Sequence, residues 1–136
     1  MNNLNDKNAI LYRRVSTTAQ KVFGNSLNAQ QSILRDFCSK NSINIIKEFQ
    51  EDYSAKNFNR PEWKKLNLFA KKNKNNIDYM LCVDWDRFSR NTYEALGVIN
   101  DFKKLNIEVN CIEKWINYND PTQIMMQLMY LGMPEV

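Results

Sequence analysis

A serine and an arginine stand together at the end of an apolar stretch near the N-terminus. Residues 9–12 are Ala, Ile, Leu and Tyr, and Arg14 and Ser16 follow with no glycine or proline in between. This pattern predicts a short buried strand that delivers a hydroxyl and a guanidinium at one end. A serine hydroxyl can attack a phosphodiester, and an arginine can bind the phosphate oxygens on which charge develops. By position alone, a serine after a strand is more often a cap or turn residue.

The composition limits the groups that could catalyse a reaction. The chain has 136 residues, a length that suits one domain with a single core. Lys and Arg number 19 against 15 Asp and Glu, and the net charge of +4 is compatible with a polyanionic partner. Histidine is absent from the sequence, which removes the commonest general base and the commonest nitrogen ligand of metals. Other side chains must therefore carry any catalysis.

The cysteines and the apolar runs indicate in which cellular compartment the protein is expected. Three cysteines without CxxC spacing favour a reducing compartment, and Cys82 and Cys111 lie in apolar stretches that predict core positions. No apolar run approaches the roughly 18 residues of a membrane span, and the polar N-terminus does not resemble a signal peptide. We expect a cytoplasmic protein that does not bind membranes.

Strand-like and helix-like segments alternate along the chain. Apolar or β-branched stretches at residues 9–12, 43–49, 77–83 and 107–112 predict four strands. Apolar residues at helical spacing follow each of them, and the helix starts are expected at Ser26, Pro61, Asn91 and Asp120. This order predicts an α/β fold, a three-layer sandwich with helices on both faces of a mainly parallel sheet of four, at most five, strands.

Polar side chains follow three of the predicted strands. Arg14 and Ser16 end the first, Asp52 ends the second, and residues 86–90 follow the third. In a parallel sheet these positions share one edge, outside the carboxyl ends of the strands, where ligands bind. The topology therefore predicts one polar site built from separate parts of the chain.

Two aspartates allow a different chemistry. Asp84 and Asp86 lie two residues apart, which would place them on one face of a strand. Carboxylates in that arrangement could chelate Mg²⁺, as in a nuclease. Spacing alone leaves this alternative open.

Four motifs occur in order along the chain: residues 12–17 with Gln20, residues 26–30, Asp52 with Arg60 and Pro61, and residues 86–90. Together they resemble the catalytic domain of serine recombinases, the resolvase and invertase family of DNA recombinases. One motif alone would be weak, but the ordered set covers nearly the whole chain. The resemblance implies a resolvase-like fold and an enzyme that breaks and rejoins DNA.

The resemblance also implies roles for individual residues. Ser16 would form a covalent 5′-phosphoserine bond to DNA while a free 3′-hydroxyl leaves, with no metal or other cofactor. The residues expected at the scissile phosphate are Arg14, Arg60, Arg87 and Arg90, with Asp86 to position arginines or help to move a proton. The expected supporting residues are Tyr12, Gln20, Gln30 and Asp52.

Partners follow from the same resemblance. DNA would be the substrate, and the protein would act as a homodimer that forms a tetramer when strands are exchanged. We expect residues 1–136 to be the catalytic-domain fragment of a longer recombinase, without its C-terminal DNA-binding region. The apolar stripe at residues 124–131 could be core or subunit interface. The alternative is a non-catalytic α/β module that only dimerises.

Overall fold

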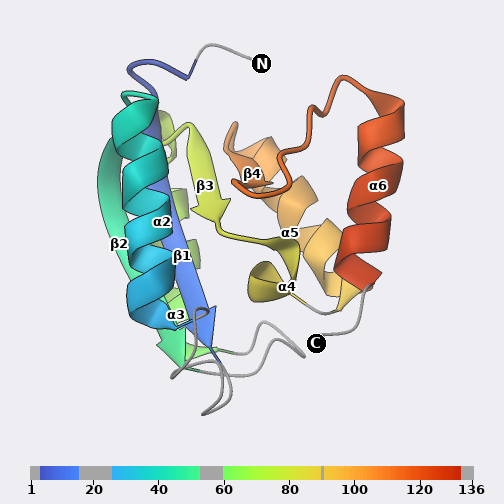
Figure 1. Cartoon of the computed structure of the whole chain (residues 1–136), viewed down its shortest axis with the longest axis horizontal. Helices are drawn as coiled ribbons and strands as arrows, with labels where there is room; N and C mark the ends of the chain where they lie inside the picture. The colour runs from blue at the N-terminus through green and yellow to red at the C-terminus, as the bar shows by residue number, and fades with distance from the viewer. Residues whose placement is uncertain (1–3, 16–25, 53–59, 90, 133–136) are drawn as a thin grey trace.

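The protein is built from alternating strands and helices (Figure 1). The computed structural model describes residues 4–15, 26–52, 60–89 and 91–132. In chain order the elements are β1 (Asn8–Val15), α2 (Leu27–Lys40), β2 (Asn44–Asp52), α3 (Pro61–Lys72), the 3₁₀ turn η1 (Lys74–Asn76), β3 (Tyr79–Cys82), α4 (Trp85–Phe88), α5 (Thr92–Lys104), β4 (Glu108–Cys111) and α6 (Pro121–Gly132). No helix in this part of the chain is long and apolar enough to cross a membrane.

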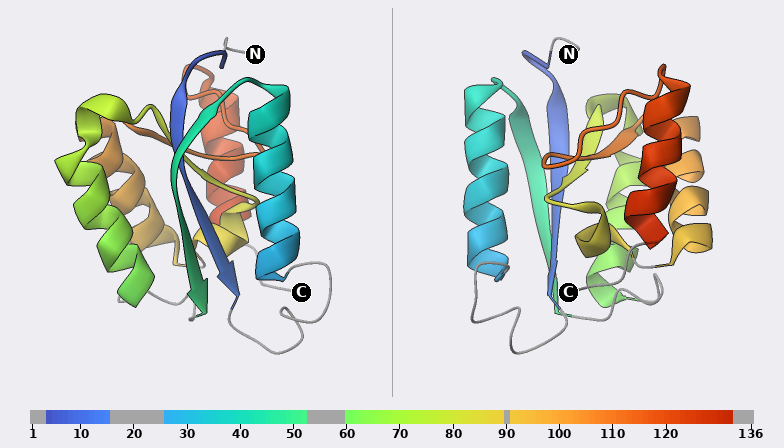
Figure 2. Two further views of the ribbon diagram at one scale, coloured as in Figure 1. Left: turned by 90° about the vertical axis from the view of Figure 1, so that its left-hand side faces the viewer. Right: turned by 45° about the vertical axis from the view of Figure 1, so that its right-hand side comes forward.

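The four strands form one parallel sheet in the order β2-β1-β3-β4. Helix α2 covers one face of the sheet, whereas α3 and α5 cover the other (Figure 2). This confirms the predicted three-layer α/β sandwich. The chain moves from β1 outward to β2 and then crosses back to β3, so the order reverses between β1 and β3. Ligands bind at such a switch point, beyond the carboxyl ends of the strands.

Each face of the sheet has its own hydrophobic core. The larger core, beneath α3 and α5, is centred on Trp63, whose ring stacks on Phe102 with the ring centroids 5.8 Å apart. The same indole makes edge contacts with Tyr12 and Phe88. The smaller core, beneath α2, is largely aliphatic around Leu34. Tyr12, a residue of the first motif, is therefore held in place by aromatic packing.

The helices begin where the sequence predicts. The side chains of Ser26 and Asn91 accept a backbone N–H in the first turn of α2 and of α5. Pro61 and Pro121 occupy the first positions of α3 and α6, where a missing N–H costs nothing. The predicted helix starts are therefore confirmed.

The strand boundaries differ from the prediction. β1 and β2 pair with each other along their whole length. These hydrogen bonds extend both strands past their apolar stretches, through Arg13 and Arg14 to Val15 in β1 and to Asp52 in β2. β3 is shorter than predicted and ends at Cys82, because Asp84 caps the one-turn helix α4, which the apolar pattern does not indicate. The prediction that Asp84 and Asp86 lie on one face of a strand is therefore wrong.

One carboxylate ties α2 to the sheet. Glu48 of β2 forms ion pairs with Arg13 of β1 at 2.7 Å and with Arg35 of α2 at 2.6 Å. The hydrogen bonds from Arg35 lower the pKa of Glu48, partial burial opposes them, and Arg13 adds to the lowering. The charged form of Glu48 is therefore favoured in the folded protein.

This contact predicts a pH dependence of stability. The pKa of Glu48 is lower in the folded protein than in the unfolded chain. Glu48 therefore stabilises the fold at a pH above its unfolded-state pKa, and this stabilisation is lost as the pH falls through its folded-state pKa. We predict that Glu48→Gln lowers the free energy of unfolding at about pH 7, and that the difference from wild type shrinks toward about pH 3.5. Urea unfolding at both pH values measures it.

An Arg35→Gln background provides the control. Without Arg35 the pKa of Glu48 should lie closer to its ordinary value, so the pH-dependent part of the Glu48→Gln effect should be smaller. An effect of Glu48→Gln that stays constant between the two pH values would contradict the prediction.

Candidate active site

The described members of the predicted site lie at the carboxyl edge of the sheet, toward which the arrowheads of β1 and β2 point in Figure 1. Tyr12 and Arg14 belong to the last half of β1, and Arg60 immediately precedes α3. Asp86 and Arg87 lie on α4, directly beyond β3. The structure therefore brings side chains from β1, α3 and α4 to the switch point between β1 and β3.

Arg14 fastens α4 to the end of β1. Its side chain is fully buried, and its Nε donates a hydrogen bond to the carbonyl oxygen of Arg87 at 3.0 Å. Its Nη2 donates to the carbonyl oxygen of Asp86, also at 3.0 Å. The carbonyl groups in the last turn of a helix have no N–H partner within that helix. In a one-turn helix several carbonyls are therefore available to donors from other elements. The guanidinium thereby fixes the main chain that carries Asp86 and Arg87.

Gln30 of α2 forms hydrogen bonds with the end of β1, at a position that β3 does not pair with. β3 pairs with β1 only over residues 9–11. At the strand end, the N–H of Arg14 donates to Gln30 Oε1 at 3.2 Å, and Gln30 Nε2 donates to the Arg14 carbonyl oxygen at 2.9 Å. Because a side-chain amide offers a donor and an acceptor as a peptide group does, the buried Gln30 acts here like a neighbouring strand.

Arg60 forms a second buried contact with α4. Its Nη1 donates to the carbonyl oxygen of Phe88 and to the hydroxyl of Tyr12, both at 3.0 Å. Burial raises the pKa of Tyr12 well above its usual value, the Arg60 guanidinium opposes this shift, and Glu51 adds to it. The phenol is therefore neutral at physiological pH, and it can accept from Arg60 while donating elsewhere.

Glu51 is the buried acid at the end of β2, and sequence inspection missed it. Its side chain is only 2% exposed, whereas its neighbour Asp52, the predicted supporting residue, is exposed. Glu51 Oε1 accepts hydrogen bonds from the Tyr12 hydroxyl at 3.1 Å and from the backbone N–H of Trp63 at 2.8 Å. One pattern could have found it, because Glu51 lies two residues after the core residue Phe49 and so faces the same side of the strand.

Asp84 is engaged by a lysine that the sequence does not single out. Lys114 Nζ lies 2.9 Å from Asp84 Oδ2, and Asp84 Oδ1 accepts the Trp85 N–H at the start of α4. The hydrogen bond to Asp84 raises the pKa of Lys114. Among the described residues, no group of three or more acidic, cysteine or histidine side chains could hold a metal ion. Both oxygens of the Asp84 carboxylate are thus engaged within the protein, by Lys114 and by the start of α4.

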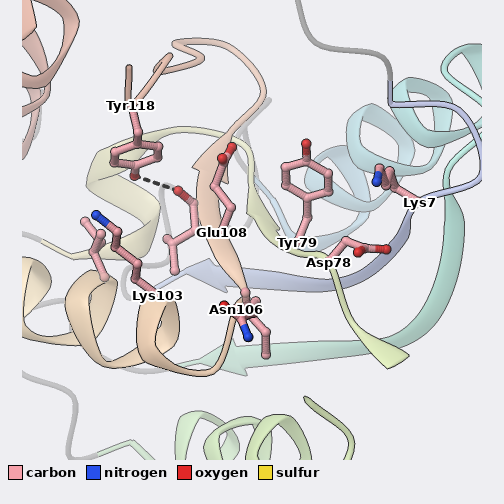
Figure 3. A pocket seen from close by; sticks show the side chains of 10 residues that line it. Lys7, Asp78, Tyr79, Lys103, Asn106, Glu108 and Tyr118 are labelled. Atoms are coloured by element: carbon pink, nitrogen blue, oxygen red, sulfur yellow. Dashed lines mark hydrogen bonds between the residues drawn. The ribbon is translucent and has the colours of Figure 1, made fainter. Parts of the chain in front are cut away.

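A cavity of about 320 Å³ opens at the opposite edge of the sheet (Figure 3). It lies at the amino ends of β3 and β4, next to the end of α5. Its labelled lining residues are Lys7, Asp78, Tyr79, Lys103, Asn106, Glu108 and Tyr118. None of these residues belongs to the predicted site, so this cavity is separate from it.

Three predicted residues lie outside the described part of the chain: Ser16, Gln20 and Arg90. In the sequence, Ser16 immediately follows Val15, the last residue of β1, and Arg90 follows Ser89, the residue after α4. Their roles remain predictions.

The fold and this edge of the sheet are those of an α/β domain with an arginine-rich site at the switch point. The sequence matches the family described as "Resolvase, N terminal domain" over residues 9–135. The chain therefore belongs to the resolvase N-terminal domain family, and its interpretation as a site-specific serine recombinase catalytic domain is confirmed. No curated protein sequence matches it significantly.

Solved structures of recombinases share the fold. The N-terminal catalytic domain of TP901-1 integrase is 25% identical, with a TM-score of 0.77 over 93% of this chain and 92% of that one. A resolvase family site-specific recombinase from Streptococcus pneumoniae is 23% identical, with a TM-score of 0.72 over 90% and 83% of the two chains. The C-terminal catalytic domain of ISC1926 TnpA, an IS607-like serine recombinase, is 18% identical, with a TM-score of 0.66 over 90% and 78%.

The contact between Gln30 and β1 predicts an effect on stability. We predict that Gln30→Ala lowers the free energy of unfolding by about 2 kcal/mol, because two buried hydrogen bonds to the Arg14 main chain are lost. Urea unfolding measures this difference. The control is Gln31→Ala, one position along α2 and only half-buried, which should change stability by less than about 0.5 kcal/mol. Equal effects of the two substitutions would show that the amide does not hold the strand end.

Proposed function

We propose that this chain cleaves and rejoins DNA with Ser16 as the nucleophile. In the cleavage step the Ser16 oxygen forms a bond to the phosphorus as the bond from phosphorus to the 3′ oxygen breaks. The serine loses its proton and the leaving oxygen gains one, which gives a 5′-phosphoserine and a free 3′-hydroxyl. The new phosphodiester conserves the bond energy, so rejoining is the reverse step and needs no external energy source.

The observation that carries this proposal is a pair of buried arginines. Arg14 lies on β1 two residues before Ser16 in the sequence, and Arg60 reaches the same strand through its hydrogen bond to Tyr12. Fixed cations stabilise the charge that develops on phosphate oxygens in the transition state. We assign this task to Arg14 and Arg60, with Arg87 on α4 and Arg90 directly beyond it. Arginine stays protonated and can provide these charges without histidine, which agrees with a chain that contains no histidine.

The other predicted residues support these groups in our proposal. Asp86 lies on α4 beside Arg87 and would position arginines or help to move a proton. Tyr12 and Gln30 hold Arg60 and the Arg14 main chain through the hydrogen bonds described above. Gln20 and Asp52 stay supporting residues by resemblance. We propose no metal or other cofactor.

We further propose a homodimer that pairs into a tetramer on DNA. Helix α6 presents an exposed apolar face, on which Met125 and Met129 are 68% and 69% exposed and Ile124 and Leu128 are partly exposed. This exposure supports our proposal that the stripe is a subunit interface. The domain would act within a longer recombinase that supplies sequence-specific DNA binding.

We keep the cytoplasm as the proposed location. Cys38, Cys82 and Cys111 are all free and buried, as expected of core thiols in a reducing compartment.

The central prediction concerns a covalent protein–DNA adduct. Incubated with nicked duplexes that tile the DNA flanking its gene, the full-length protein should form an adduct that survives a denaturing gel. Ser16→Ala should abolish the adduct because no other hydroxyl replaces the nucleophile, and EDTA should leave the wild-type adduct unchanged.

Three outcomes separate the alternatives. An undiminished adduct from Ser16→Ala would contradict the assignment of the nucleophile. Cleavage that EDTA abolishes would favour the magnesium nuclease. Dimerisation without cleavage at any site would favour the non-catalytic module.

The apolar face of α6 predicts a second measurable property. Met125→Glu with Met129→Glu places two charges on one face of the helix, since the residues are four apart. We predict that this double variant is monomeric at concentrations at which the wild type dimerises, by sedimentation equilibrium. Leu68→Glu, at an apolar residue on α3 that is 69% exposed, should leave the dimer intact. A double variant that dimerises as the wild type does would place the interface elsewhere.

A further inference from the structure

We propose that Glu51 is a positioning residue of the recombinase site, because its buried carboxylate holds both the side chain and the main chain of Arg60. This inference rests on the proposed function, in which Arg60 acts on the phosphate. Glu51 reaches Arg60 by two routes, one through the Tyr12 hydroxyl and one through the first turn of α3.

The first route sets the hydrogen-bond direction of Tyr12. A phenol has one proton, and Tyr12 donates it to Glu51 Oε1 at 3.1 Å. The oxygen of Tyr12 is then oriented to accept the Arg60 Nη1 hydrogen bond at 3.0 Å. A carboxylate can only accept, so it fixes this direction. The order Arg60 to Tyr12 to Glu51 is therefore imposed by the chemistry of Glu51.

The second route fixes the backbone at Arg60. The first N–H groups of a helix have no partner within it, and Arg60, the N-cap residue immediately before α3, makes no side-chain cap. Glu51 supplies the missing acceptor from β2, since Oε2 accepts the Glu62 N–H at 3.0 Å and Oε1 accepts the Trp63 N–H at 2.8 Å. Its negative charge also suits the positive end of the helix dipole. Between Arg60 and Glu62 lies Pro61, whose φ is fixed, so this cap restrains the Arg60 main chain.

The consequence reaches α4. The same Arg60 Nη1 donates to the Phe88 carbonyl at 3.0 Å, so a carboxylate on β2 helps to set the position of the helix that carries Asp86 and Arg87. In this proposal Glu51 is a positioning residue. It acts through Arg60.

A glutamine at this position would break the arrangement with little change of shape. The amide has one oxygen and one NH₂ group. At the Oε2 position the NH₂ group would face the Glu62 backbone N–H, and at the Oε1 position it would face both the Trp63 backbone N–H and the Tyr12 hydroxyl. In the first orientation the cap that restrains Arg60 is lost, and in the second the Tyr12 proton would also have to reverse, so the hydrogen bond between Arg60 and Tyr12 should weaken.

The matched control is Glu62→Gln. Glu62 is also in the first turn of α3, so this variant removes the same charge from the same helix end. Its side chain pairs with Lys65 on the helix surface at 3.0 Å, and only its main chain contacts Glu51. An effect of Glu51→Gln that Glu62→Gln lacks therefore does not come from the helix dipole.

The first experiment needs no DNA and uses this chain. In NMR spectra of the wild type and both variants, the Tyr12 ¹³Cζ resonance and the Arg60 guanidinium ¹⁵N resonances report the hydrogen bond between these side chains. We expect both to shift in Glu51→Gln and to stay in place in Glu62→Gln. Unchanged Tyr12 and Arg60 resonances in a folded Glu51→Gln would overturn the proposal.

The second experiment measures single-turnover adduct formation by the full-length protein on the nicked duplexes described above. We expect Glu51→Gln to form the adduct about tenfold more slowly than Glu62→Gln, with DNA affinity changed less than about twofold. Tyr12→Phe, which removes the first route alone, should also slow adduct formation but by no more than Glu51→Gln. The double variant should be no slower than Glu51→Gln, because Tyr12 lies on one of the two routes that Glu51→Gln already disturbs. Additive defects, or equal rates for Glu51→Gln and Glu62→Gln, would refute the role of Glu51.

The two proposals fail in distinguishable ways. A wild type that forms no adduct through Ser16 contradicts the proposed function, while the NMR spectra still decide whether Glu51 controls the contact between Tyr12 and Arg60. If Glu51→Gln does not fold, Tyr12→Phe tests the first route by the Arg60 ¹⁵N resonances and by the rate of adduct formation.

Discussion

Two buried guanidinium groups hold three successive carbonyl oxygens, and the rest of the site depends on this contact. Arg14 binds the carbonyls of Asp86 and Arg87, and Arg60 binds that of Phe88. The two arginines come from different elements, the end of β1 and the start of α3. A one-turn helix has almost no internal stability, because helix formation has a costly first turn. The arginines therefore supply from outside the hydrogen bonds that α4 cannot make for itself.

This contact explains why the neighbouring elements are placed as they are. Arg14 can reach α4 only if β1 continues past the end of β3, and Gln30 provides the hydrogen bonds that keep this overhanging part extended. Arg60 can reach α4 only if α3 begins at the carboxyl edge, where Glu51 caps it. Packing of Trp63 against Tyr12 fixes the same region from the core side. The end of β1, the start of α3 and the core around Trp63 thus all help to position α4.

Much of this could be predicted from the sequence, for reasons that lie in particular residues. Alternating apolar segments and the caps at Ser26 and Asn91 predicted the parallel sandwich, since these features act within a few residues of each other. Strand periodicity places Glu51 on the core side of β2, but it does not predict what Glu51 binds, since its partners are the distant Tyr12 hydroxyl and main-chain N–H groups of α3. Lys114 could not be predicted either, because its partner Asp84 is distant in the sequence. The helix α4 escaped prediction because its stability comes from those distant arginines.

The acceptors of Arg14 and Arg60 are backbone atoms, and this affects how the domain can change during evolution. A carbonyl oxygen is present whatever amino acid occupies its position, so residues 86–88 can be replaced without removing a partner of either arginine. A search for residue pairs that change together across homologues would therefore pass over this contact. The arginines constrain the path of the chain, and they leave the identities of those three side chains to be selected for their own chemistry.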